Sequence, residues 1–269
     1  MEKKRDQKND FLFKFDHAFT LIRSIMKKLL FCIVLTGFFY QVRSQEKSYD
    51  TMAIVILDHM SAILGDLNSC RFRLDVETDI SDPETGTITN HETSDISFGG
   101  PDKMLMHIQG DKGHRGYWYN GKTLTWYSFT ENNYVVIDAP DNTIAMIDSV
   151  NDTYGIDFPA ADFFYPTFTD DLIGQSDYIS YLGKTRLNDK TCLQIVAKNK
   201  EMTMQFWISD EALFLPIKMV IVYNDKSRVR RYEATFSDWQ INPELPSAMF
   251  EFALPPGANQ VAILSKKSK

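Results

Sequence analysis

The residues from Ser69 to Ile80 alternate between apolar and charged side chains. Cys70, Phe72, Leu74, Val76 and Ile80 occupy even positions, and the odd positions between them carry Arg, Asp or Glu. Successive side chains of a β-strand point to opposite faces, so this period of two indicates a strand with one buried and one solvated face. Such a strand needs paired neighbours and a cover over its apolar face, which restricts the chain to a sheet-based fold.

Similar segments recur along most of the chain, separated by short turn sequences. Asp82 to Gly86 is typical of a turn, and Asn120-Gly121 tolerates the positive φ angles of a type I′ hairpin. We therefore predict about eleven strands. They cover residues 69–80, 87–98, 103–109, 115–119, 122–129, 134–139, 178–186, 191–198, 203–209, 215–223 and 228–239.

Two regions have helical spacing instead. Apolar residues recur every three to four positions between Tyr49 and Leu67, with Asp50 placed to favour the helix N-terminus. The second region, 142–174, predicts a helix over 142–154, a short helix from Pro159 to Tyr165 and one further turn at 170–174. The order lacks βα alternation, so we predict an antiparallel α+β fold in one domain, residues 45–269.

The strands of the second half carry apolar residues on both faces. Ile217, Met219 and Ile221 share one face of their strand, whereas Val220 and Val222 lie on the other. A strand that is apolar on both faces is expected to be covered on both. A curved sheet with helices packed inside it meets this need, and such a sheet often encloses a cavity.

The segment 26–44 resembles a secretory signal peptide. Lys27 and Lys28 precede an apolar run, and Val42 and Ser44 suit the positions before a cleavage site. We interpret residues 1–25 as an upstream start or a disordered leader, so translation starts at Met1 or Met26. The alternative is an uncleaved anchor over 21–40, but its apolar run is shorter than the ~20 residues that a spanning helix needs. We expect a cleaved, exported, periplasmic protein.

Charge and cysteine content narrow the possible partners. The formal net charge is −7 at pH 7, and removal of the basic first 44 residues makes it more negative. Such a protein is repelled by nucleic acid and by anionic membrane surfaces, so we predict no nucleic-acid partner. As a separate prediction, we expect a monomer. Cys32 lies in the middle of the apolar run, which argues against a lipoprotein anchor. Cys70 and Cys192 form a disulfide or remain two buried free thiols.

The sequence contains no recognised catalytic or metal-binding motif. His59, His107 and His114 do not have the spacing of metal ligands, and neither a GxSxG nor an HExxH motif occurs. We interpret Asp170-Asp171 and Asp210-Glu211 as solvent-exposed carboxylates in turns and not as a catalytic acid/base pair. We therefore predict no catalytic residue, no metal and no cofactor.

Aromatic residues make up 13% of the chain. They are explained either by strand propensity and core packing or by a pocket for an apolar ligand. The predicted ligand contacts are Trp118, Trp126, Phe163, Phe164, Trp207 and Met219.

Four blocks of the sequence resemble the DUF2092 family of predicted periplasmic proteins. They are residues 99–140, YGIDFPAADFFYP at 154–166, residues 191–225, and residues 237–263 with their closing FEFALPPGANQVAI. This family is similar in fold to the lipoprotein carriers LolA and LolB. The resemblance implies a half-open antiparallel β-barrel of about eleven strands wrapped over helices, with a hydrophobic cavity for acyl chains.

The carriers also use an arginine inside the barrel to control closure of the lid. The sequence does not identify the residue that would match that arginine. Arg71 and Arg73 lie on the solvated face of their strand, which argues against both. The leading hypothesis is a non-catalytic periplasmic protein that holds a lipid or lipoprotein acyl chains and releases them when 142–174 moves. The alternatives are an envelope sensor or interaction module that binds another envelope protein and, third, an enzyme.

Overall fold

The computed structural model describes residues 47–224 and 229–266. The predicted leader at 1–25 and signal peptide at 26–44 lie outside the described residues. Within the described part of the chain, no helix has the length and apolar character needed to cross a membrane.

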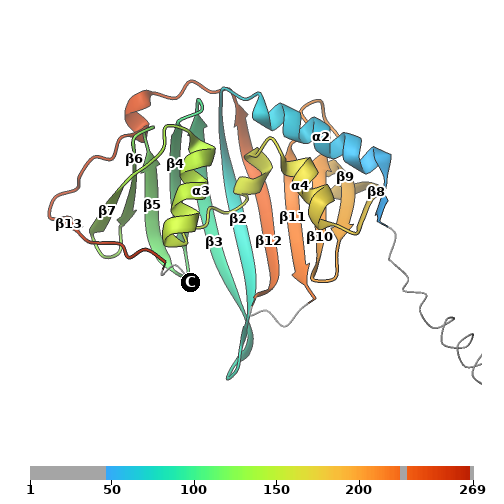
Figure 1. The fold of residues 1–269 in the computed structure, drawn as a ribbon, viewed down its shortest axis with the longest axis horizontal. Coiled ribbons are helices and arrows are strands. Elements are labelled where there is room, and N and C mark those ends of the chain that lie inside the picture. The colour runs from blue at the N-terminus through green and yellow to red at the C-terminus, as the bar shows by residue number, and fades with distance from the viewer. Residues whose placement is uncertain (1–46, 225–228, 267–269) are drawn as a thin grey trace, which may run out of the picture. The chain divides into compact units, whose positions relative to one another are not determined.

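A single, mostly antiparallel sheet forms the body of the protein (Figure 1). Its spatial order is β1-β8-β9-β10-β11-β12-β2-β3-β4-β5-β6-β7-β13. The strands are β1 (Ser48–Tyr49), β2 (Ser69–Asp82), β3 (Gly86–Gly99), β4 (Lys103–Gly110), β5 (Gly113–Tyr119), β6 (Thr123–Ser128), β7 (Asn133–Asp138), β8 (Tyr178–Leu187), β9 (Lys190–Lys198), β10 (Met202–Ser209), β11 (Pro216–Tyr223), β12 (Val229–Ile241) and β13 (Asn259–Gln260).

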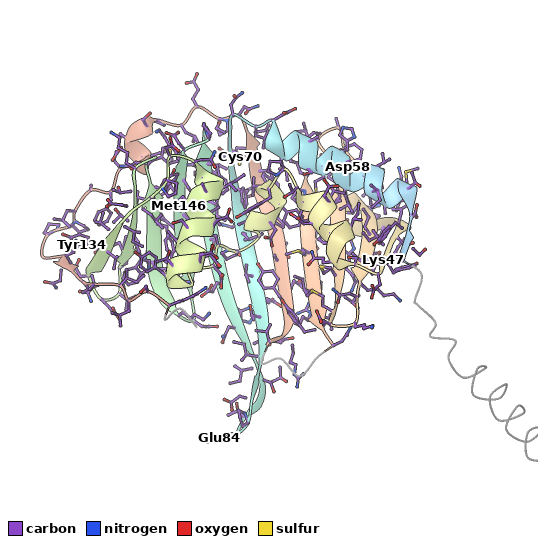
Figure 2. The ribbon with its side chains drawn as sticks, in the orientation of Figure 1. Lys47, Asp58, Cys70, Glu84, Tyr134 and Met146 are labelled. Carbon is purple, nitrogen blue, oxygen red and sulfur yellow. The ribbon has the colours of Figure 1, made fainter. Side chains whose placement is uncertain are left out.

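The long strands β2 to β12 confirm the eleven predicted from the sequence. Strands β1 and β13 were not predicted, and each adds a two-residue parallel pair at one edge, to β8 and β7 respectively. The two edges do not pair with each other, so the sheet stays open as a half-open barrel. The pairing of β12 with β2 joins the two halves of the chain, and the β2–β3 hairpin carries Glu84 at its projecting tip (Figure 2).

The helices lie together over one face of the sheet, which we call the inner face (Figure 1). They are α2 (Thr51–Gly65), α3 (Thr143–Tyr154), the 3-10 helix η1 (Ala161–Phe164) and α4 (Phe168–Gln175), while η2 (Ser247–Phe250) lies near the end of the chain. Asp50 and Asn142 cap α2 and α3 by accepting hydrogen bonds from backbone N–H groups of the first turn.

These helices confirm the two predicted helical regions, with small differences. The predicted helix from Pro159 to Tyr165 is a single 3-10 turn, and the predicted turn at 170–174 is part of the eight-residue α4. The expectation that β11 is covered on both faces holds only in part. Val220 is buried, but Val222 on the same outer face is 36% exposed, because solvent reaches this end of the strand.

Cys70 and Cys192 are both buried free thiols, so the structure selects that alternative over the disulfide. Burial raises the pKa of Cys70 to about 12, and burial also raises the pKa of Cys192. Because the thiolate is the reactive form, we expect both thiols to react with Ellman's reagent at pH 8 at least about 100-fold more slowly in the native protein than in urea. Rapid labelling of the native protein would contradict this burial.

Candidate functional site

A hollow lies between the inner face of the sheet and the segment that contains α3, η1 and α4. Its volume is about 750 Å³. We call it the main hollow. Its apolar wall consists of Ile147, Ile156, Phe158, Pro159, Ala160, Ala161, Phe168, Leu172, Met204, Phe206, Met219 and Ile221, with Tyr165, Tyr223 and Tyr232. This volume falls within the range of small-molecule sites.

Strand register explains why β10, β11 and β12 supply one side of this wall. Phe206 of β10 pairs with Met219 of β11, and Ile221 of β11 pairs with Tyr232 of β12. Cross-strand partners point to the same face of a sheet. The alternation that places these residues at every second position therefore turns them all towards α3 and α4.

A second hollow of about 460 Å³ lies on the other side of η1. The C-terminal end of α2, the first residues of β2 and the start of α3 line it, together with Phe98 and Phe164. Three residues, Ile147, Ala161 and Tyr165, line both hollows. The two spaces are therefore neighbours that share a partition.

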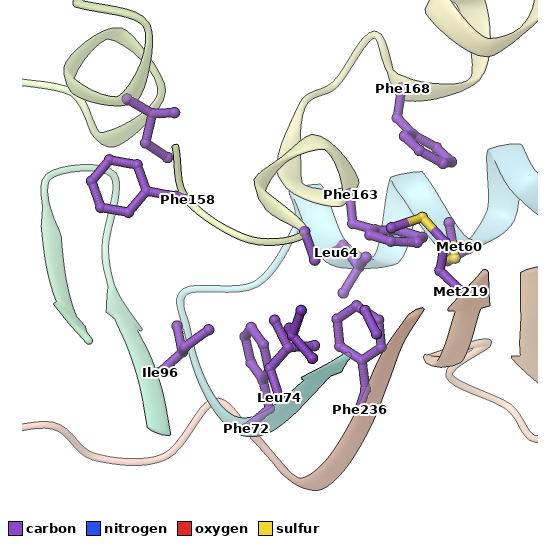
Figure 3. Close-up of a cluster of buried hydrophobic side chains, with 14 of the residues drawn as sticks. Met60, Leu64, Phe72, Leu74, Ile96, Phe158, Phe163, Phe168, Met219 and Phe236 are labelled. Carbon is purple, nitrogen blue, oxygen red and sulfur yellow. The ribbon is translucent and has the colours of Figure 1, made fainter. Parts of the chain in front are cut away.

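Phe163 anchors this partition in the core. Its ring lies 5.0 Å from that of Phe168, 5.3 Å from that of Phe236 and 6.0 Å from that of Phe206, and it is 1% exposed. Figure 3 shows it pointing from η1 towards the sheet, between Phe168 and Phe236. The Tyr165 hydroxyl donates a 2.6 Å hydrogen bond to Asp148 of α3, which ties η1 to that helix.

The structure places the six predicted contact residues in different environments. Met219 lines the main hollow and Phe164 lines the second one. Phe163 lines neither hollow, and its ring packs in the core beneath η1. Trp126 packs against the inner core but lines neither hollow.

The last two predicted contacts, Trp118 and Trp207, lie on the outer face, away from both hollows. Trp118 packs 5.1 Å from the ring of Phe252, in the segment after η2, and Trp207 lies beneath the ammonium group of Lys218. The difference from the prediction has a simple cause. Tyr117 and Phe206 take the inner positions, so alternation sends each following tryptophan to the opposite face.

Strand β5 also places an arginine, Arg115, on the inner face of the sheet. Its Nη2 lies 3.0 Å from both carboxylate oxygens of Glu92, and the two side chains are 19% and 13% exposed. Burial raises the pKa of the neighbouring Tyr117, while Arg115 opposes that shift. The sequence held one indication of this position. Arg115, Tyr117 and Tyr119 are alternate residues of one strand, so the arginine shares a face with the two buried tyrosines. Arg71 and Arg73 lie on the outer face, as predicted.

Five aspartates surround the main hollow, and we call them the acidic rim: Asp148, Asp152, Asp157, Asp162 and Asp171. All five are exposed, and none of the described residues that line this hollow is Lys, Arg or His. Desolvation raises the pKa of Asp162, and the negative charges of Asp171 and Asp157 raise it further. Among the described residues, no group of three or more His, Cys, Asp or Glu side chains could hold a metal ion.

Comparison with solved structures finds distant similarities that cover most of this chain. An uncharacterised conserved protein from Thermus thermophilus is similar at a TM-score of 0.44 and 14% identity, over 78% of this chain and 99% of that one. LprF from Mycobacterium bovis follows with a TM-score of 0.42 and 12% identity, over 79% and 100%. A LolA superfamily protein from Nitrosomonas europaea has a TM-score of 0.33 and 11% identity, over 74% and 97%.

Sequence comparison gives a more direct result. A family model described as "Predicted periplasmic protein (DUF2092)" matches residues 53–264, from within α2 to beyond β13. No curated protein matches the chain.

Proposed function

The chain belongs to the DUF2092 family of predicted periplasmic proteins, and from this premise we propose that it is a non-catalytic binding protein for acyl chains of a lipid or lipoprotein. The observation that carries the proposal is the main hollow, which has an apolar wall and an opening lined by exposed side chains. Met219 is the predicted contact that lies in its wall. Phe164 extends the apolar surface into the second hollow.

The energy available in such a site is sufficient for binding. Burial of each methylene group stabilises a complex by about 0.8 kcal/mol, so a twelve-carbon chain gains on the order of 10 kcal/mol before entropy costs. The cover is the segment from α3 to α4, since it forms the whole wall opposite the sheet. Outward movement of this segment would admit and release the chain.

Two adjacent residues of β11 provide a matched test. Ile221 lines the main hollow, whereas Val222 lies on the outer face and is 36% exposed. We expect Ile221→Trp to fill part of the hollow and to weaken the binding of dodecanol about tenfold, which corresponds to the loss of about two buried methylene groups. Val222→Trp should change the affinity less than about twofold.

Isothermal titration calorimetry of both variants and the unmodified protein, below the solubility limit of dodecanol, measures this difference. Circular dichroism of each variant checks that it is folded. Equal affinities for the two variants, or no binding of dodecanol by any folded form, would overturn the assignment of the main hollow as the binding site.

A further inference from the structure

The charges around the main hollow specify the ligand more closely than its apolar wall does. We propose that the main hollow takes a cationic amphiphile, an alkyl chain that ends in an ammonium group, with the chain against the wall and the ammonium group at the acidic rim. This inference rests on the function proposed above. It adds the chemical class of the head group.

The acidic rim carries charge that the described residues do not neutralise. None of its five aspartates forms an ion pair within the described part of the chain. The hydrogen-bond donors to three of them are neutral: Tyr165 to Asp148, Asn151 to Asp157, and Thr167 to Asp171. Lys266 packs against Gly155 at the end of α3, and it does not line the hollow.

The position of these charges relative to the apolar wall matches the shape of an amphiphile. Asp148 and Asp152 lie one turn apart on α3, and both line the hollow together with Ile147 of the same helix. Asp162 belongs to η1 and Asp171 to α4. Carboxylates therefore approach the opening from every element of the cover, while the sheet opposite supplies Met204, Phe206 and Met219.

Two further observations indicate that this opening suits a positively charged group. Like charges crowd there, since Asp171 and Asp157 both raise the pKa of Asp162, and a cation would relieve that repulsion. In addition, the Tyr232 hydroxyl in the wall is inaccessible and has no hydrogen-bond partner among the described residues. Burial raises the pKa of Tyr232, and the negative charge of Asp162 raises it further, so this hydroxyl lies within the electrostatic reach of the acidic rim.

The test compares three probes of equal chain length: dodecylamine, dodecanol and dodecanoate. At pH 7 they present a positive, a neutral and a negative head group to the same hollow. We expect dodecylamine to bind about tenfold more tightly than dodecanoate, with dodecanol between them, because several exposed carboxylates each contribute a fraction of a kcal/mol. Raising the salt concentration to 0.5 M should reduce this ratio severalfold, since screening weakens exposed charges.

Variants assign the selectivity to the acidic rim. Asp152→Asn with Asp162→Asn removes two charges that line the hollow and whose side chains form no hydrogen bond or ion pair among the described residues, so no such bond is lost. Asp58→Asn with Asp138→Asn removes two exposed charges elsewhere, on α2 and β7. The first pair should lower the ratio of dodecylamine to dodecanoate affinity at least about threefold, and the second should leave it within about 1.5-fold.

The outcomes separate this inference from the function on which it rests. Equal binding of all three probes would overturn the cationic head group and leave the acyl-chain site standing. A preference for dodecylamine that survives the rim variant would also overturn it, because the charges responsible would lie elsewhere. Failure of all three probes to bind would remove the proposed function itself.

Discussion

Phe163→Ala is expected to lower the free energy of unfolding by about 3–5 kcal/mol, the cost of deleting a fully buried phenylalanine. The ring is 1% exposed and contacts Phe168, Phe206 and Phe236, which belong to a helix and two strands. These neighbours come from separate elements, so they cannot all move inwards to fill the space. Urea denaturation followed by circular dichroism measures the change.

The neighbouring residue gives the control. Phe164 also packs against the core, but it is only partly buried and lines the second hollow. Phe164→Ala should therefore cost clearly less, about 1–2 kcal/mol, because solvent already reaches part of the ring. Equal costs for the two variants would show that Phe163 is not the anchor of the partition.

The Phe163→Ala substitution is also expected to change the binding of alkyl chains. Removal of the Phe163 ring takes away the core packing of η1, which carries Ala161 of the partition between the hollows of about 750 and 460 Å³ and is therefore expected to loosen that partition. If the variant remains folded at low temperature, we expect it to bind longer alkyl chains with higher affinity than the unmodified protein does. A shift of the preferred chain length from dodecanol towards hexadecanol in a calorimetric series would be the observed sign.

The strands were predictable because their signal is local. In β2, apolar and charged residues alternate from Cys70 to Glu77, and Asn120-Gly121 lies in the turn between β5 and β6, where Gly121 has a positive φ of 88° and Asn120 does not. The edge strands β1 and β13 contain two residues each, too few to show any period. Their existence depends on the neighbours β8 and β7, which sequence patterns alone do not position.

The candidate site was less predictable, because the strands near it are apolar on both faces. The sequence shows that Phe206 and Trp207 point in opposite directions, but it does not show which face the helices cover. Of the residues predicted as contacts, Trp207 and Trp118 therefore lie on the outer face, while Met219 lies in the wall of the main hollow. The hollows themselves result from how η1 packs between the sheet and α3, a property of tertiary packing.

Arg115 shows the same limit for charged residues. A charged side chain in a strand is normally expected on the solvated face. Its partner Glu92 belongs to β3, which is separated from β5 by β4. The register of three strands, Ser94 with Ile108 and Ile108 with Arg115, has to be known before this pair can be recognised.

Arg115→Met is expected to destabilise the protein by about 3–5 kcal/mol, because it leaves the Glu92 carboxylate buried without its partner. The double variant Arg115→Met/Glu92→Gln removes both charges and should recover much of that loss. The two single variants and the double variant form a cycle, which urea denaturation at pH 7 measures. We expect a coupling energy of about 2–3 kcal/mol.

Arg73 and Asp95 provide the matched control for this cycle. They form the same type of ion pair at 3.0 Å, but on the outer face with 45% and 62% of the side chains exposed. Their coupling should be only about 0.2–1 kcal/mol, since solvent screens exposed pairs. If both cycles gave the same small coupling energy, Arg115 would be exposed to solvent in solution. The inner face beside β5 would then be more hydrated than its packing indicates. A large difference would instead establish a buried charge pair on the surface that faces the helices.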